Sequence, residues 1–223
     1  MKVQLALPLE PREAFARENF VVGTTNADAL AFVESWPGWR VPAAVIHGPT
    51  GAGKSHLAVI WQRLSGARLI SAADVGSEFL PAGPLAIEDV DSESGEEACA
   101  HALFQVLERA TLSAPVLLTG RETPFLWPCA VPDLASRFSA LPDFQLLPPD
   151  DTLLSGIARK LFADRQLAVP DSAIERMLHS LERSPSAIRA FVRDVDRRAL
   201  AESRPVTAVL IRELLAERDK RLS

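Results

Sequence analysis

One stretch constrains the fold of this chain more than any other: Gly48-Pro49-Thr50-Gly51-Ala52-Gly53-Lys54-Ser55, which matches G-x-x-x-x-G-K-[ST] in full. It lies in the context that this motif needs, after an expected buried strand at 41–47 and at the start of an expected helix at 55–64. Glycines at 48, 51 and 53 let the backbone curl so that successive N–H groups face one anion-sized hollow. The motif predicts a nucleotide-phosphate site in which Lys54 reaches the β- and γ-phosphates and Ser55 supplies a hydroxyl to Mg²⁺.

Up to residue 149 the chain alternates between short apolar runs and helical periodicity. Expected strands lie at 41–47, 68–70, 84–87, 114–119 and 144–147, and expected helices at 55–64, 72–80 and 98–110. A further helix follows the loop at 19–26, with Thr25 or Asn26 as its N-cap. This alternation predicts an α/β fold with a mainly parallel five-stranded sheet flanked by helices.

Beyond Pro149 only helical patterns follow, at 151–164, 171–181, 185–201 and 206–218. The charge balance changes at the same place, because residues 1–150 carry a net charge of −8 and residues 151–223 a net charge of +3. We therefore expect a flexible N-terminal segment at 1–12, a nucleotide-binding α/β domain at 13–149 and a small all-α C-terminal domain at 150–223.

Composition excludes several classes of protein. A net charge of −5 argues against a dedicated nucleic-acid binder held by phosphate contacts. Neither a membrane-spanning run nor a signal peptide is expected, which predicts a cytoplasmic protein. Cys99 and Cys129 form no CxxC pair and, like the four histidines, have no metal-ligand spacing, so they are interpreted as structural residues.

Two carboxylates, Glu88 and Asp89, follow the expected strand at 84–87 directly. The carboxyl ends of parallel strands meet at the edge of the sheet where ligands bind. As a Walker B segment, Glu88 would help to hold Mg²⁺ and Asp89 would position an attacking water. The alternative is an ordinary acidic loop, since further acids follow closely.

The N-terminal residues Gln4-Leu5-Ala6-Leu7-Pro8-Leu9 place three leucines on alternate positions, so that an extended chain presents them on one face. Pro8 disfavours a helix here and removes a backbone donor. Local pattern leaves two interpretations open: a first strand packed on the core, or a peptide that docks in a groove of another protein.

Several segments together resemble the AAA+ domain of the bacterial replication initiator DnaA. They are 19–26 (NFVVGTTN), the P-loop, 85–89 (LAIED), 116–120 (VLLTG), 131–138 (VPDLASRF) and the helical tail, in the same order as in DnaA. The resemblance implies an AAA+ P-loop NTPase fold with a helical lid. It covers nearly the whole chain but stops where DnaA continues into its DNA-binding domain, so no dedicated DNA-binding domain is expected. An initiator-like module of this kind is similar to the Hda family of DnaA-related regulatory inactivation proteins.

The resemblance implies roles for individual residues. Phe20, Val21 and Val22 would lie near the adenine, residues 48–55 would hold the phosphates of ADP or ATP, and His56 and Arg189 would add to that site. Arg137 looks like the arginine finger that acts on the nucleotide of a neighbouring DnaA molecule. Residues Gln4, Leu5, Leu7, Pro8 and Leu9 match the Q-L-x-L-P-L motif with which that family binds the β sliding clamp.

Three departures from the initiator pattern concern hydrolysis. Glu88 stands where DnaA has Asp, Arg121 occupies the sensor 1 position, and Ser186 occupies the expected sensor 2 position with Arg189 nearly one turn further on. These changes predict that the chain binds nucleotide but hydrolyses it weakly or not at all. The pattern is compatible with either ADP or ATP as the resident nucleotide and with a homodimer.

The leading hypothesis is a replisome-associated AAA+ regulator, tethered to the DNA-loaded clamp, that activates hydrolysis of DnaA-bound ATP and so limits initiation of replication. The alternative is a self-sufficient AAA+ ATPase that acts as an initiator-type motor or helicase loader, suggested by the complete P-loop and the two acids Glu88 and Asp89.

Overall fold

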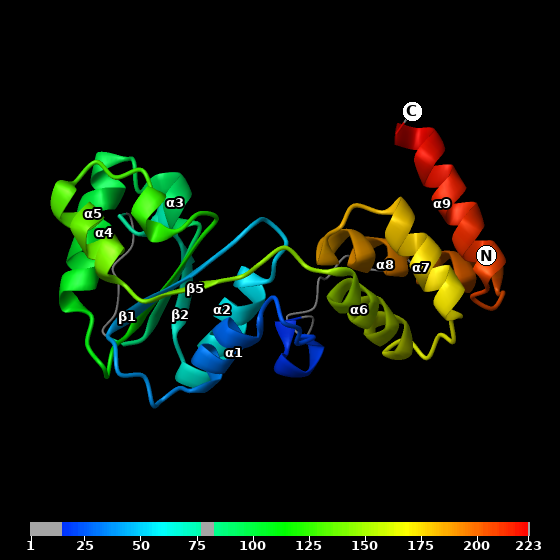
Figure 1. Cartoon of the computed structure of the whole chain (residues 1–223), viewed down its shortest axis with the longest axis horizontal. Coiled ribbons are helices and arrows are strands. Elements are labelled where there is room, and N and C mark those ends of the chain that lie inside the picture. The colour runs from blue at the N-terminus through cyan, green and yellow to red at the C-terminus, as the bar shows by residue number, and fades with distance from the viewer. Residues whose placement is uncertain (1–14, 77–82, 223) are drawn as a thin grey trace, which may run out of the picture.

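The computed structural model describes residues 15–76 and 83–222, with side chains described up to residue 218. Its sheet contains β1 (Ala43–His47), β2 (Arg68–Ser71), β3 (Leu85–Glu88), β4 (Val116–Gly120) and β5 (Asp143–Gln145). The strand order is β2-β3-β4-β1-β5 and every pairing is parallel. Figure 1 shows where this sheet lies in the molecule. The predicted five-stranded parallel sheet is confirmed.

The central strands β1 and β4 are buried along their whole length, which explains their nearly continuous apolar sequences. Alternate side chains of β1 enter two different cores. Ala44 and Ile46 pack with α1 (Ala27–Glu34) and α2 (Lys54–Ser65), whereas Val45 packs with α4 (Glu97–Arg109) and α5 (Pro132–Ala140). The sheet is therefore covered by helices on both faces.

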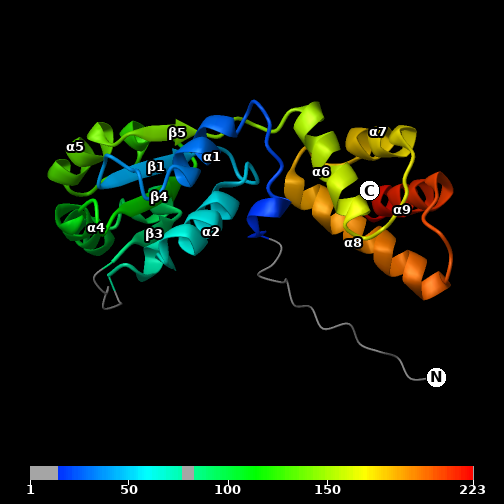
Figure 2. The same ribbon diagram turned by 90° about the horizontal axis from the view of Figure 1, so that it is seen from below.

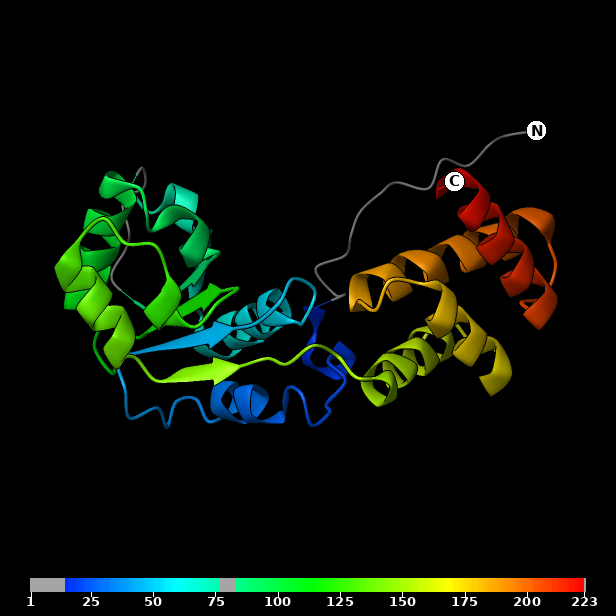
Figure 3. The same ribbon diagram turned by 45° about the horizontal axis from the view of Figure 1, so that its top comes forward.

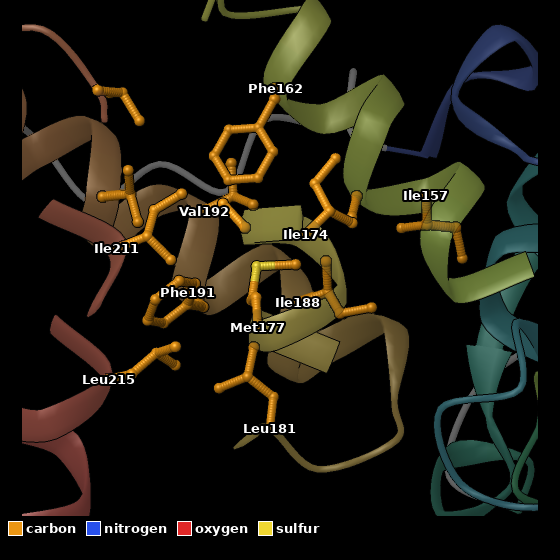
Figure 4. Close-up of a cluster of buried hydrophobic side chains, with 14 of the residues drawn as sticks. Ile157, Phe162, Ile174, Met177, Leu181, Ile188, Phe191, Val192, Ile211 and Leu215 are labelled. Atoms are coloured by element: carbon orange, nitrogen blue, oxygen red, sulfur yellow. The ribbon is translucent and has the colours of Figure 1, made fainter. Parts of the chain in front are cut away.

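The helical bundle consists of α6 (Asp151–Ala163), α7 (Asp171–Ser180), α8 (Pro185–Glu202) and α9 (Ala208–Leu222). Its core contains apolar side chains from all four helices, among them Phe162, Met177, Phe191 and Ile211 (Figure 4). Side-chain caps stabilise the starts of α6 and α8. Asp150 accepts a hydrogen bond from the Leu153 amide at 2.7 Å, and Ser184 accepts one from the Ala187 amide at 3.2 Å.

The bundle lies beyond the carboxyl edge of the sheet. Figure 3 shows the arrowheads of β1 and β5 pointing towards it. The loops that follow β1, β3 and β4 therefore face the bundle, and these loops carry the P-loop and the acidic residues.

One predicted helix is wrong where the structure describes it. The segment expected at 72–80 forms a single 3₁₀ turn, η3 (Ala72–Asp74), followed by a turn at 75–76, and residues 77–80 lie outside the described residues. Ser71 caps this turn by accepting a hydrogen bond from the Ala73 amide, and Val75 is buried. Local capping and the burial of one apolar residue favour a short turn over a continued helix.

One short helix was not predicted, α3 (Val90–Glu93). A short helical stretch is expected just before Arg137, and the structure places Arg137 itself in the last turn of that helix, α5. The proposed docking peptide, residues 4–9, lies outside the described residues, so neither interpretation of it is tested.

Candidate nucleotide-binding site

The P-loop joins β1 to α2 and has the backbone conformation that its glycines permit. Gly51 and Gly53 have φ angles of +80° and +110°, and Gly48 has φ +149°. A Cβ atom on Gly48 would lie 2.3 Å from the carbonyl oxygen of Leu146, so no other residue fits there without displacing the loop. The loop thus depends on positive φ angles at Gly51 and Gly53, and on the missing side chain at Gly48.

Lys54 bonds to the backbone of the loop that precedes it. Its ammonium Nζ donates to the carbonyl oxygens of Gly48 at 2.6 Å and Pro49 at 3.0 Å, and the residue is only 8% exposed. Burial lowers the pKa of this ammonium, and the nearby carboxylates of Asp89 and Asp91 oppose that shift. A buried cation enclosed by a backbone loop is suited to bind phosphate.

The acidic edge of the sheet is formed by the loop after β3. Asp89 has a left-handed backbone (φ +57°), and its amide donates to Thr119 Oγ1 of β4 at 3.3 Å. Asp91 Oδ2 accepts a hydrogen bond from the Arg121 amide at 2.9 Å, while its buried Oδ1 has no hydrogen-bond partner among the described residues. Asp91 therefore connects the ends of β3 and β4, a role that the sequence did not indicate.

A cleft of about 1030 Å³ lies between the α/β part and the helical bundle. Nine of the residues proposed from the sequence line it: Val21, Thr50, Gly51, Gly53, Lys54, Ser55, His56, Asp89 and Arg189. The structure therefore brings Asp89 to the same cavity as Lys54 and Ser55, from which it is distant in the sequence.

Other proposed residues do not line this cleft. They are Phe20, Val22, Gly48, Pro49, Ala52, Glu88 and Arg137. Phe20 is buried beside the P-loop, since a Cβ on Gly53 would lie 3.3 Å from its ring, and Val22 is 48% exposed. Phe20 thus supports the loop from behind, and of the two acids only Asp89 reaches the cleft.

Sequence reasoning missed most of the wall that the helical bundle contributes. Lys160, Arg165 and Arg193 line the cleft, together with Arg121, Arg189 and the P-loop lysine. Among the described residues that line the cleft, Asp89 and Asp164 are the only acids. One signal was present in the sequence: residues 186, 189 and 193 recur at helical spacing and share one face of α8. Such an excess of positive charge fits a polyanionic ligand.

His56, in the first turn of α2, contacts the segment around Phe15 and Ala16. Its Nε2 donates to the carbonyl oxygen of Ala16 at 3.0 Å, and the rings of Phe15 and Phe20 lie edge-on to the imidazole. Burial lowers the pKa of His56 to about 4, with the positive charge of Arg189 adding to the shift. The imidazole is therefore neutral at physiological pH.

Arg137 lies outside the cleft, on α5. Its guanidinium pairs with the carboxylate of Glu108, and it lies 4.9 Å from the centre of the Phe104 ring, both on α4. The side chain is 40% exposed. The arginine is therefore accessible to another molecule and does not contact the nucleotide cleft of its own chain.

Within the described residues, no group of three or more His, Cys, Asp or Glu could hold a metal ion by itself. Neither cysteine forms a disulfide: Cys99 is buried and Cys129 is half-buried. Among the helices that the structure describes, none is both long and apolar enough to cross a membrane.

No protein-family model and no curated protein matches the chain. Among solved structures, domain III of the replication initiation protein DnaA from Thermotoga maritima matches 95% of this chain over 98% of its own length, with a TM-score of 0.76 and 20% identity. DnaA from Aquifex aeolicus bound to AMPPCP matches 80% of this chain but only 63% of its own, with a TM-score of 0.65 and 20% identity. The T. maritima RuvB Holliday junction branch migration motor matches 86% of this chain and 68% of its own, with a TM-score of 0.66 and 18% identity. The fold is thus that of an AAA+ domain with a helical lid.

Proposed function

We propose that this chain is a DnaA-related, nucleotide-bound AAA+ regulator that stimulates hydrolysis of ATP bound to DnaA while tethered to the β sliding clamp. The observation that carries the proposal is the position of Arg137, which is exposed on α5 and outside the chain's own cleft. In an initiator-like fold, an arginine placed in this way can act on a neighbour's nucleotide. Such a regulator would work in the cytoplasm, at the replisome.

The cleft is the proposed site for ADP or ATP with Mg²⁺. The P-loop amides and Lys54 would hold the phosphates, and Ser55 and Asp89 would hold the metal ion, which neutralises phosphate charge when bound. The residues present fit this group, since a buried lysine, a hydroxyl and a carboxylate meet at the carboxyl edge of the sheet.

The same residues suggest little hydrolysis by the chain itself. Glu88 does not line the cleft, and Arg121, at the position that the resemblance identifies as sensor 1, does line it. Catalysis of phosphoryl transfer depends mainly on charged groups held at the right positions around the phosphates. These replacements therefore favour a protein that retains its nucleotide. We therefore propose a regulatory rather than a motor role for the bound nucleotide.

Arg137 would act in trans by stabilising charge that develops on the transferred phosphate of DnaA-bound ATP. An arginine supplied in trans contributes on the order of 10³–10⁵ in rate. Its pairing with Glu108 opposes this only weakly, because both side chains are at least 40% exposed and such pairs contribute about 0–1 kcal/mol. Arg137 can therefore exchange Glu108 for a phosphate at low cost.

The test measures turnover of DnaA-bound ATP in the presence of clamp loaded on DNA. We expect Arg137→Ala to lose the stimulation while still binding ADP, and Arg109→Ala, an exposed arginine at the end of α4, to retain it. Full stimulation by Arg137→Ala would refute the proposed role. The tether is tested separately by a clamp pull-down with a Gln4→Ala/Leu7→Ala variant, and normal retention of that variant would exclude it.

A second candidate is a self-sufficient ATPase, favoured by the meeting of Lys54, Ser55 and Asp89 in one cleft. Steady ATP turnover by the purified chain alone, abolished in Lys54→Ala, would support it. Normal nucleotide binding without turnover would exclude it in favour of the regulatory role.

A further inference from the structure

The short segment before the expected base-binding residues lies against the cleft. It includes η2 (Arg17–Asn19), and Figure 2 shows it, in blue, between α2 and the helices α6 and α8. Phe15, Asn19 and Val21 all contribute to the lining. The sequence had placed only residues 20–22 near the base, so Phe15 is an unassigned part of this cavity.

Phe15 contacts both halves of the molecule. Its ring lies edge-on to His56 of α2, with 5.3 Å between the ring centres and an interplanar angle of 88°. The guanidinium of Arg189, on α8, lies 5.8 Å from the centre of the same ring. The adjacent residue Ala16 is buried and accepts the His56 hydrogen bond. The position of the ring is thus fixed by one residue from each side of the cleft and by its own backbone.

The cleft is chemically divided in a way that suits a nucleotide. Its cationic residues and the P-loop suit phosphates, whereas Phe15, Val21, Ile157 and Leu161 supply apolar lining. Val21 packs close to α6, since a Cβ on Gly156 would lie 3.3 Å from Val21 Cγ1. A flat base with two apolar faces is the part of a nucleotide that such a lining accommodates.

We propose that Phe15 forms one wall of the base-binding part of the nucleotide site and contacts the face of the bound base. The inference rests on the proposed binding of ADP or ATP, and adds to it a residue outside every motif that the sequence displayed. The Arg189 guanidinium lies over one face of the ring, so a bound base would contact the opposite face. Because Phe15 is only half-buried, its ring can gain contact area when a base is present.

The experiment compares ADP with pyrophosphate, which carries the phosphates but no base. Affinities of both are measured by calorimetry for the full chain and for Phe15→Ala, Phe15→Leu and Phe15→Tyr. Base–aromatic stacking corresponds to roughly a 5- to 150-fold change in affinity on removal of the ring. We expect Phe15→Ala to weaken ADP binding within that range, Phe15→Leu to weaken it less, Phe15→Tyr to restore it, and pyrophosphate binding to stay unchanged in all three.

Two controls separate this inference from its premise. Phe125→Ala removes a ring that is 76% exposed and outside the cleft, and should leave both affinities unchanged. Lys54→Ala should lose ADP and pyrophosphate together, and normal ADP binding by that variant would overturn nucleotide binding itself. Unchanged ADP affinity in Phe15→Ala and Phe15→Leu, or an equal loss of affinity for ADP and pyrophosphate, would refute the proposed contact of Phe15 with the base. Neither result would refute nucleotide binding itself.

Discussion

Acid should destabilise the α/β part of this protein through His56. The unperturbed pKa of histidine is about 6.5, and burial lowers that of His56 to about 4, with Arg189, Arg63 and Arg17 adding unfavourable positive charge and the Ala16 carbonyl opposing them. Between these two values the unfolded chain binds a proton that the folded chain rejects. Stability is therefore complete above about pH 6.5 and falls as the pH is lowered towards 4.

The expected loss follows from the two pKa values. At pH 5 the unfolded imidazole is almost fully protonated and the folded one largely neutral, so His56 lowers the free energy of unfolding by about 2 kcal/mol relative to pH 8. Below pH 4 the loss reaches its limit of about 3 kcal/mol, since each pKa unit corresponds to about 1.4 kcal/mol. This is a large part of the stability of an ordinary domain.

The measurement is urea unfolding at a series of pH values between 8 and 5, followed by tryptophan fluorescence. All four tryptophans lie in the α/β part of the chain, and the rings of Trp39 and Trp61 stack with 4.9 Å between their centres in the core beneath α2. Fluorescence therefore reports on the part of the protein that holds His56 and not on the helical bundle.

The matched variant is His56→Gln, because glutamine retains an N–H donor for Ala16 but does not titrate in this range. We expect its loss of stability between pH 8 and pH 5 to be smaller than that of the parent by about 2 kcal/mol. His101→Gln, at an exposed position, should lose as much stability between pH 8 and pH 5 as the parent. Equal pH dependence in His56→Gln and the parent would refute the assignment of the acid sensitivity to this residue.

Three further predictions concern single positions. Gly48→Ala should abolish ADP binding measured by calorimetry, because its Cβ would lie 2.3 Å from the Leu146 carbonyl oxygen, and an unchanged affinity would show that the loop can yield. Phe191→Ala should lower the free energy of unfolding of the bundle by about 3–5 kcal/mol in urea titrations followed by circular dichroism, because it empties a fully buried site, and a loss below 1 kcal/mol would contradict this packing. Asn26→Ala should cost about 1–3 kcal/mol and weaken ADP binding, since Asn26 Nδ2 donates to the Val21 carbonyl oxygen at 3.0 Å; unchanged stability and affinity would refute this support.

The sequence predicted those parts of the fold whose signals are local. The apolar run of β1, the glycines of the P-loop and the helical spacing of α2 lie within about 25 consecutive residues and each has its own pattern. The four helices of the bundle are amphipathic and were also predicted, with ends that differ from the observed ones by one or two residues, except that α9 runs four residues further. Capping and fraying account for such differences at helix ends.

The missing parts depend on contacts between distant segments. Phe15 and Arg189 meet only after the bundle packs near the P-loop, and no periodicity relates positions so far apart. The link between Asp91 and Arg121 likewise depends on β3 and β4 being neighbours in the sheet. The candidate site was thus predictable where one strand and one helix build it, and not where tertiary packing completes it.

The hydrogen bond from His56 to the Ala16 carbonyl also has a mechanical consequence. Within the described residues, a pull along the chain from the N-terminal side reaches Phe15 and Ala16 first, and this bond passes the load to the first turn of α2, two residues after Lys54. Tension would therefore arrive at the phosphate-binding loop before it reaches the sheet. A molecule held at Ala16 would have its candidate nucleotide site directly in the line of force.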